Sequence, residues 1–392
     1  MLFSLSLILI IGFSLSGILN RFKIPGLLGM IFTGIILGPY VLNLISPDIL
    51  NISTDLREIA LIVILTRAGL SIDINDLKKV GRPAILMCFV PATLEIIAIT
   101  LLAPIFLNIS YIEAAIMGTV VAAVSPAVIV PRMLHLMESG HGKDKSIPQI
   151  IMAGASVDDI YVIVLFTAFM GMYKGEGFNI STLLAVPLSI ISGMGLGIMT
   201  GIILVKIFKK LHMRDTIKVL IILSIAFIFV TLETAMKPYF PISGLLAVMA
   251  LGATILKTYG VLAKRMMGKF SKIWVAAEIL LFVLVGAAVD INYLSGAGLM
   301  AVLLILCALI LRIAGVNISL LKTTLNMKER IFCSIAYLPK ATVQAAIGAI
   351  PLAEGVKSGN TILTIAVLAI FITAPIGAIG VDNTYKKLLH KS

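Results

Sequence analysis

The stretch that decides the fold is residues 154–166, GASVDDIYVIVLF. It sets two adjacent carboxylates, Asp158 and Asp159, inside a run that is otherwise apolar, and no charged side chain follows before Lys174. A soluble protein places such a pair in a loop or at the start of a helix, because ionised groups are costly to bury. The pair therefore needs a special environment, and the composition of the rest of the chain identifies it.

The composition is that of an integral membrane protein. Of the 392 residues, 60% are hydrophobic and 13% are charged, and the mean hydropathy is +1.12. Soluble domains are about 45–50% apolar and about 25% charged. The cysteines, Cys88, Cys307 and Cys333, are too scattered for a disulfide framework or a metal cluster. Residues 2–19 lack a basic leader and a small-residue cleavage site, so they are expected to form a membrane helix.

The lengths of the apolar segments predict an all-α polytopic membrane protein. A helix needs about 20 mainly apolar residues to cross the hydrocarbon core, and this criterion predicts about thirteen transmembrane helices. The predicted spans are residues 2–19, 25–45, 55–70, 83–107, 111–136, 150–171, 181–207, 216–235, 241–258, 272–290, 296–320, 329–351 and 360–381.

The distribution of basic residues predicts the orientation. Most of the 31 Lys and Arg residues lie in the C-terminal tail and in the connections after odd-numbered spans, including Lys78, Lys79 and residues 206–218. Basic residues stay in the cytoplasm, so the N-terminus is expected outside the cell and the C-terminus inside, across the plasma membrane. The net charge of +12 is thus a topology signal, and no nucleic-acid partner is expected. His135 and His141 are expected in a solvated cytoplasmic loop.

Ionisable groups from four spans are expected at similar depth in the membrane. A rise of about 1.5 Å per residue from the cytoplasmic helix ends places them roughly 12–18 Å deep, near the middle of a core of about 30 Å. Charged groups are costly there and usually mark functional sites. The groups are Glu95, Asp158, Asp159, Arg312 and Lys340. Three acids and two bases leave one negative charge, which predicts a site that holds one exchangeable positive charge.

Asp158 and Asp159 have the chemistry of a site shared by a proton and a metal cation. Two carboxylates so close in a low dielectric do not both ionise without a cation. One apparent pKa is therefore expected to rise toward neutrality, and the pair is expected to titrate as a coupled unit. A purely structural, hydrogen-bonded acid is the alternative. It accounts less well for two acids about 100° apart on one helix, which can border one cavity.

The other buried charges are expected to be structural. Glu95 and Arg312 are expected to form an ion pair, because an unpaired arginine at that depth would be very costly. Lys340 follows the helix-breaking Pro339 and is expected to neutralise the carbonyl ends of half-helices where two broken helices cross. A direct role of Lys340 in transport is the alternative. Glu278 has no assigned role.

Proline interrupts two of the predicted spans. Ser125 and Pro126 break the span at residues 111–136, and Pro339 breaks the span at residues 329–351. Either break could be an ordinary proline kink that neighbouring helices repair. However, spans 4–6 and 11–13 run in opposite directions, so the breaks occupy corresponding places in an inverted repeat. Interrupted helices at corresponding places point to the midplane site of a secondary transporter.

These motifs resemble those of the cation–proton antiporters. The resemblance lies in ASVDDIYVIV at residues 155–164 and PKATVQAAIG at residues 339–348, together with Glu95 and Arg312. It is closest to the NHA-type sodium/proton exchangers of animals and their prokaryotic relatives. It implies an NhaA-like antiporter fold, with inverted repeats and two discontinuous crossing helices, in a homodimer surrounded by lipid.

The resemblance also implies a division into domains. Residues 83–171 and 296–382 would form the core ion-transport domain. Residues 2–70 and 216–290 would form the dimerisation scaffold, and residues 181–207 the linker helix. Transport would be elevator-like, with the core carrying the ion site across the membrane.

The reaction that the resemblance implies is exchange of Na⁺ or Li⁺ for protons at the Asp pair, without a cofactor. Further ligands for the cation would come from Val124, Ser125 and Ser156. Electrogenic relatives have Lys at the position of Arg312, and arginine cannot release its proton. One-for-one, electroneutral exchange is therefore expected.

Three other functions are compatible with some of these features. A potassium/proton antiporter and a sodium-coupled solute symporter remain as alternatives. An intramembrane aspartyl protease takes its acids from different helices, one of them after glycine, and this chain has no Gly-Asp pair. No enzymatic activity is expected.

Overall fold

The computed structural model describes residues 1–22, 24–71, 81–176, 180–236 and 240–391. Within these ranges the regular secondary structure is helical, apart from one isolated β-bridge between His141 and Lys391. Lys78 and Lys79, which contributed to the predicted orientation, lie outside the described residues.

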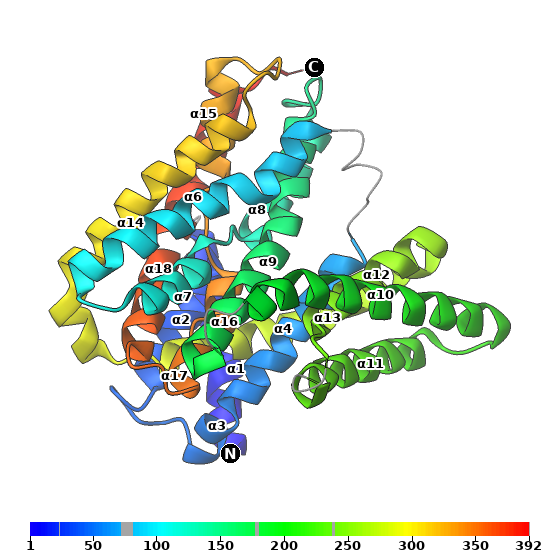
Figure 1. Ribbon diagram of the computed structural model, residues 1–392, viewed down its shortest axis with the longest axis horizontal. Helices are drawn as coiled ribbons and strands as arrows, with labels where there is room; N and C mark the ends of the chain where they lie inside the picture. The colour runs from blue at the N-terminus through cyan, green and yellow to red at the C-terminus, as the bar shows by residue number, and fades with distance from the viewer. Residues whose placement is uncertain (23, 72–80, 177–179, 237–239, 392) are drawn as a thin grey trace. The chain divides into compact units, whose positions relative to one another are not determined.

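The chain divides into two compact units, whose helices are labelled in Figure 1. The first unit comprises Met1–Thr54, Asn75–Tyr173 and Leu281–Ser392. Its helices are α1 (Leu2–Arg21), α2 (Gly26–Leu37), α3 (Pro47–Asn51), α6 (Arg82–Leu107), α7 (Tyr111–Ala122), α8 (Pro126–Ser139), α9 (Ile147–Gly171), α14 (Ile291–Ser319), α15 (Met327–Ala336), α16 (Thr342–Ile347), α17 (Ile350–Ala353) and α18 (Gly359–Leu388). The second unit comprises Asp55–Ile74 and Lys174–Leu280. It holds most of α4 (Ser53–Gly69) and α13 (Gly260–Ala287), together with α10 (Ile180–Lys210), α11 (Asp215–Met236) and α12 (Gly244–Thr258).

The described residues contain nine helical segments that are long and apolar enough to cross a membrane. Three shorter apolar segments lie at Gly26–Leu37, Gly244–Thr258 and Thr342–Ala353. A helix, or a group of helices separated by a break, lies over each span predicted from the sequence. The all-helical architecture is thus confirmed for the described residues, whereas the number of crossings stays a prediction.

The two proline-interrupted spans are broken in the structure, and the breaks are in contact. Between α7 and α8 the chain is extended, with φ −65° and ψ 140° at Ala123, and Pro126 begins α8. Pro339 lies in the gap between α15 and α16. The backbone N–H of Ser125 donates to the carbonyl of Pro339 at 2.8 Å, so each break satisfies a backbone group of the other.

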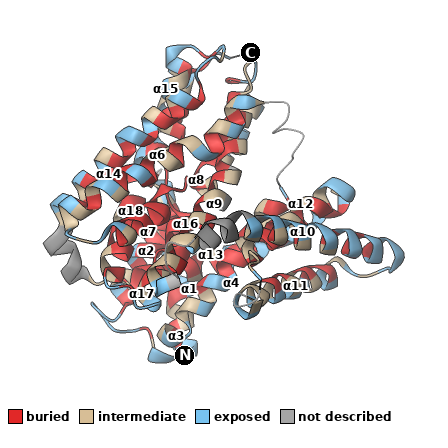
Figure 2. Cartoon of the chain, in the orientation of Figure 1, coloured by how far each residue is buried: buried red, intermediate tan, exposed pale blue. Residues whose placement is uncertain are grey.

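In the first unit, α6 and α14 lie side by side (Figure 1). Gly315 permits this close approach, because a Cβ at this position would lie 2.7 Å from the Cα of Pro91. Arg312 is about one turn before Gly315, and Glu95 is about one turn after Pro91. The packing of these two helices therefore places the two charged side chains opposite each other. Figure 2 shows that α7, beside them, is buried along most of its length.

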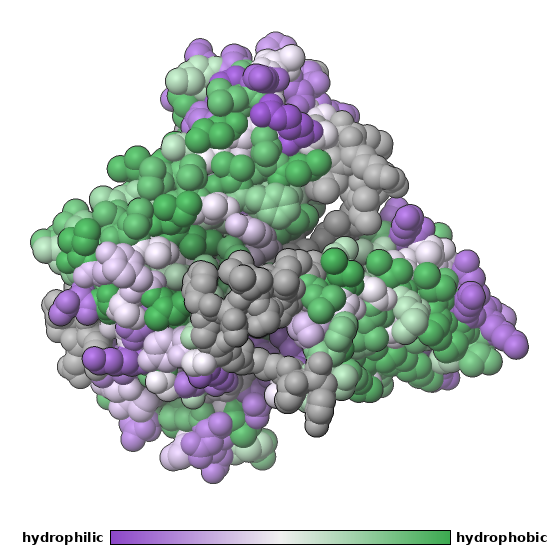
Figure 3. All heavy atoms as spheres, viewed as in Figure 1, coloured by the Kyte–Doolittle hydropathy of each residue, from purple (hydrophilic) through white to green (hydrophobic). Residues whose placement is uncertain are grey.

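An apolar cluster fills the end of the first unit that carries the C-terminus. It includes Leu136, Ile147, Tyr337, Val381 and Leu389, all buried. Hydrophilic residues gather on the surface around α15 and the C-terminus, beyond a band of hydrophobic surface over α14 (Figure 3). This end is the one predicted to face the cytoplasm.

His141 departs from the sequence expectation. It was expected in a solvated loop, but it is only 9% exposed. The backbone N–H of Gly142 donates to the carbonyl of His390 at 2.8 Å, and the rings of His141 and Tyr385 lie 4.9 Å apart. The returning C-terminal segment therefore covers His141, whereas His135 is exposed on α8.

In the second unit, α12 packs against α10 and α11 (Figure 1). The hydroxyl of Ser192 on α10 donates to the carbonyl of Pro241 at 2.7 Å. The carboxylate of Glu233 on α11 accepts from the N–H of Gly244 at 2.7 Å, at the start of α12. Polar contacts thus fix both neighbours of α12 near its N-terminus.

Candidate functional site

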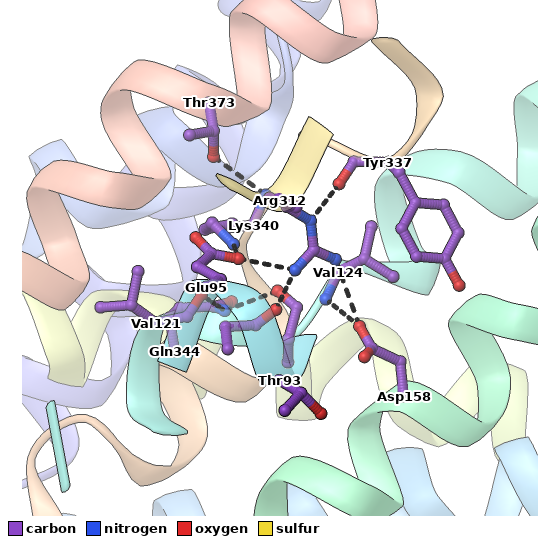
Figure 4. Close-up of polar contacts among 12 residues, drawn as sticks. Thr93, Glu95, Val121, Val124, Asp158, Arg312, Tyr337, Lys340, Gln344 and Thr373 are labelled. Atoms are coloured by element: carbon purple, nitrogen blue, oxygen red, sulfur yellow. Dashed lines mark hydrogen bonds and ion pairs between the residues drawn. The ribbon is translucent and has the colours of Figure 1, made fainter. Parts of the chain in front are cut away.

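The charged groups predicted at mid-depth form one buried cluster in the first unit. Glu95 comes from α6, Asp158 and Asp159 from α9, Arg312 from α14, and Lys340 from the break before α16. Four of these residues are 0% exposed, and Asp159 is 8% exposed. Figure 4 shows side chains from these separate segments converging.

Glu95 is the counter-charge of two cations. Its Oε2 accepts from Arg312 Nη1 at 2.6 Å and from Lys340 Nζ at 2.8 Å (Figure 4). Charge-assisted hydrogen bonds of this length are strong, and in a buried site they are weakly screened. Glu95 therefore joins α6 to α14 and to the break before α16.

Asp158 is held from two sides. Its Oδ2 accepts from the backbone N–H of Val124 at 2.8 Å and from Arg312 Nη2 at 3.3 Å. Its Oδ1 and the Oδ1 of Asp159 are buried and have no hydrogen-bond partner among the residues that the structure describes. Carboxylate oxygens in this state are available to a proton or a cation.

A count of the charges in these contacts shows which acid has no compensating base. Arg312 and Lys340 carry two positive charges, and Glu95 and Asp158, which they contact, carry two negative charges. This part of the cluster is formally neutral. Asp159 is then the acid without a compensating base among the described ion pairs of the cluster.

The last carbonyls of α7 have no hydrogen-bond partner within the helix, and side chains from other segments donate to them. Gln344 Nε2 donates to the carbonyls of Val121 at 3.0 Å and Ala123 at 2.8 Å, and Arg312 Nη1 donates to the carbonyl of Ala122. Lys340 was expected to compensate helix ends, but the contact described for its ammonium is with Glu95. Gln344 and Arg312 occupy the place expected for it at this helix end.

Tyr337 contacts the guanidinium group of Arg312, and the sequence analysis did not predict this contact. Its backbone carbonyl accepts from Arg312 Nε at 2.6 Å, and the guanidinium carbon lies 5.2 Å from the centre of its ring. Its hydroxyl donates to the carbonyl of Met87 on α6 at 3.0 Å. An aromatic residue directly before the Leu-Pro-Lys motif was the available signal for this residue.

Three further residues, Val124, Ser125 and Ser156, were predicted as cation ligands. The N–H of Val124 donates to Asp158, so the group of Val124 that is expected to bind a cation is its backbone carbonyl. Ser125 is fully buried, and its hydroxyl lies 3.5 Å from that of Thr342 across the two breaks. Ser156 lies on α9, but its side chain lies outside what the structure describes. The roles of these residues stay predictions.

Glu278 is on the part of α13 that belongs to the second unit, whereas the charged cluster belongs to the first unit. Its carboxyl hydrogen-bonds to Trp274 and interacts with the charge of Arg67 on α4. It therefore has local partners within its own unit.

Comparisons with known proteins identify the family of the chain. The family described as sodium/hydrogen exchanger, transmembrane, matches residues 5–387. Sodium/hydrogen exchanger 9B2 of Mus musculus is 33% identical over 383 residues, which cover 94% of this chain and 69% of that protein. The Homo sapiens protein of the same name is 34% identical over 391 residues, covering 94% of this chain and 70% of that protein. The chain thus spans about two thirds of the length of these relatives.

A solved structure shows the same fold. The sodium proton antiporter MjNhaP1 from Methanocaldococcus jannaschii superposes with a TM-score of 0.84, covering 98% of this chain and 97% of that one. Its sequence identity of 20% carries the likeness of fold alone. Together with the match over residues 5–387, these findings show that the chain belongs to the sodium/hydrogen exchanger family and is a multi-pass membrane transporter, not an enzyme.

Proposed function

We propose that the protein is a secondary active Na⁺/H⁺ antiporter that also accepts Li⁺, in which cation and proton compete for Asp158 and Asp159. The observation that supports this most directly is the charge count of the buried cluster. Two acids and two bases compensate each other, and Asp159 is left with a buried oxygen that has no partner among the described residues. An ionised acid in such a place needs a positive charge, which either ion supplies.

The proposal gives the residues different roles. Asp159 takes the exchangeable charge, and the free Oδ1 of Asp158 completes the binding of the cation. The hydroxyl of Ser125, which is buried at the break, is the proposed source of a further oxygen. Asp158 remains partly neutralised by Arg312 while Asp159 exchanges its ion.

Coupling follows from the cost of moving an uncompensated charge. A site that holds a proton or a cation is neutral and crosses at low cost, whereas a bare carboxylate pair is penalised in the low dielectric. Elevator movement of the core at residues 83–171 and 296–382 against the scaffold, in a homodimer with a cytoplasmic C-terminus, is the proposed carrier of the site. Each crossing then needs one ion, which makes the exchange obligatory.

The arginine supports one-for-one, electroneutral exchange. Arg312 keeps its proton throughout the cycle, because guanidinium is not deprotonated in proteins. Its contacts with Glu95 and Asp158 hold its charge within the site. The exchangeable charge is then the single one at Asp159.

The experiment is ion exchange in proteoliposomes with the membrane potential clamped. A pH gradient is imposed, Na⁺, Li⁺ or K⁺ is added, and luminal pH is followed for the wild type, for Asp159→Asn and for the control Asp144→Asn, an exposed acid between α8 and α9. We expect proton movement with Na⁺ and Li⁺ that does not depend on the clamped voltage, that Asp144→Asn keeps and that Asp159→Asn loses. Robust exchange by folded Asp159→Asn protein would refute the role of this acid. Proton movement with K⁺ alone would identify K⁺ as the transported cation. Dependence on the clamped voltage would refute one-for-one exchange.

A further inference from the structure

We propose that Gln344 is a positioning residue that sets the competition between proton and cation at Asp158. It acts through the peptide unit that joins Ala123 to Val124. The inference rests on the proposed function, since it concerns the same acid pair. Gln344 belongs to α16 and reaches the broken end of α7, so it also links the two interrupted spans.

The orientation of the Gln344 amide is fixed by its neighbours. The side chain is 0% exposed, and its nitrogen contacts the carbonyl oxygens of Val121 and Ala123. Carbonyl oxygens only accept, so the NH₂ group and not the amide oxygen must face them. Both hydrogens of the amide are therefore used, and its oxygen is buried without a hydrogen-bond partner in the described part of the chain.

The decisive feature is that one peptide unit carries both contacts. The carbonyl of Ala123 accepts from Gln344 at 2.8 Å, and the N–H of Val124 donates to Asp158 Oδ2 at 2.8 Å. These two groups belong to the same planar, rigid amide. Fixing the oxygen end of the plane therefore aims the N–H end at the carboxylate. A hydrogen bond to the oxygen also polarises the N–H and strengthens its bond to Asp158.

Without Gln344 this peptide would have little to hold its orientation. Val124 lies in the extended gap between α7 and α8, outside the hydrogen-bond ladder of either helix. The last carbonyls of a helix lack partners within it. Among the described contacts at the end of α7, Arg312 donates to the carbonyl of Ala122, and Gln344 donates to the carbonyls on both sides of it. Loss of the amide would free the plane to rotate.

The consequence for transport is a change in proton competition. The N–H of Val124 stabilises the ionised form of Asp158 more than the protonated form, because a carboxylate is the stronger acceptor. If that N–H turns away, protons hold the site more tightly, and more Na⁺ is needed to displace them. The effect must fade at alkaline pH, where few protons compete. A lost cation ligand or a damaged fold would have no such pH dependence.

The test compares Gln344→Met with Gln149→Met, because Gln149 is the other glutamine of the chain and lies near the start of α9. Methionine keeps the length of the side chain and removes both donors. The half-saturating Na⁺ concentration and the maximal rate are measured in proteoliposomes from pH 6 to pH 9. Na⁺-dependent thermal stabilisation of the purified protein is measured over the same range. Gln344→Glu is a second variant, which retains one donor when protonated.

For Gln344→Met we expect the half-saturating Na⁺ concentration to rise about tenfold at pH 6 and to stay within about twofold of wild type at pH 9, as for a weakened charge-assisted hydrogen bond. The maximal rate should change little, Gln149→Met should match wild type, and Gln344→Glu should lie between. A rise of equal size at every pH would overturn the inference and make Gln344 a cation ligand, and an unchanged value would overturn it outright. If the wild type itself neither exchanges nor binds Na⁺, the proposed function fails first.

Discussion

Replacing Glu95 by glutamine tests the charge arrangement of the site most directly. The two side chains have the same shape, so the change removes charge with little effect on packing. In the wild type a single oxygen, Glu95 Oε2, lies 2.6 Å from Arg312 Nη1 and 2.8 Å from Lys340 Nζ. Glu95→Gln leaves these two buried cations facing each other, with one contact of Arg312 to Asp158 remaining.

The size of the effect follows from these distances. At an effective dielectric constant of about 20, each contact corresponds to about 6 kcal/mol of Coulomb attraction. Desolvation offsets much of this, and loss of one partner from a buried pair costs about 3–5 kcal/mol in net stability. The entropy of unfolding of a chain of 392 residues is about 0.8 kcal/mol per kelvin. We therefore expect the Tm of Glu95→Gln to fall by about 4–6 °C.

The assay is thermal unfolding of purified protein in detergent, with a second substitution as the rescue. Lys340→Met in the Glu95→Gln background removes the cation that has lost its partner, so the double variant should recover a substantial part of the lost Tm. Asp382→Asn is the control, because its ion pair with Arg132 is partly exposed and worth at most about 1 kcal/mol. Two results would refute the inference that Glu95 compensates both Arg312 and Lys340. One is a Tm of Glu95→Gln within about 1 °C of wild type, and the other is a double variant no more stable than the single one.

Two further predictions concern packing and pH. Gly315→Leu should lower the Tm by about 1–4 °C and reduce exchange, because overpacking costs about 1–3 kcal/mol and α14 must move away from α6. Gly298→Ala on the same helix, where no atom lies within 4 Å of the added Cβ, should not be destabilised. Burial, and then neighbouring lysine charges, hold the pKa of His141 below its ordinary value, so protonation opposes the folded state. The wild type should therefore lose stability as pH falls below about 6.5, and His141→Phe should lose less, as measured by Tm from pH 8 to pH 5. An equal loss in both proteins would contradict this assignment.

Helical segments and their breaks could be predicted because the signals are local. A run of about 20 apolar residues has to be a helix in a membrane, since the backbone must satisfy its own polar groups there. Pro126 and Pro339 mark the breaks because proline lacks the N–H that a helix interior needs. That the two breaks exchange a backbone hydrogen bond was not predictable, because it depends on how distant helices pack.

The depth of the candidate site and the pairing of Glu95 with Arg312 were predictable, but its other contacts were not. Position along a helix gives depth, so Glu95, Asp158, Arg312 and Lys340 could be placed in one layer. Rotation about the helix axis and the tilt of each helix decide which atoms meet, and the sequence states neither. The contact of Lys340 with Glu95 instead of a helix end is one result of this. Gln344 was visible as a polar residue in an apolar run, yet its function depends on carbonyls more than two hundred residues away.

The burial of His141 was missed for a related reason. A short segment with glycine and charged residues reads as a solvated loop, and the residues around it, Ser139 to Lys145, gave no contrary signal. The covering residues come from the C-terminus, where the carbonyl of His390 accepts from Gly142. Contacts between segments so far apart follow from the tertiary fold and not from local pattern.

The stoichiometry of exchange depends on which base in the cluster keeps its proton. With Arg312 and Lys340 both charged, Glu95 and Asp158 are compensated, and the cycle carries one exchangeable charge at Asp159. Arginine holds its proton under all conditions of the cycle, whereas lysine is able to release one when buried. Lys340 is nevertheless bound to Glu95 at 2.8 Å, and release of its proton would leave that carboxylate with Arg312 as its only described cation. The proposed electroneutral exchange therefore rests on the contact between Lys340 and Glu95 as much as on the arginine, and in this proposal Glu95 keeps both charges in place.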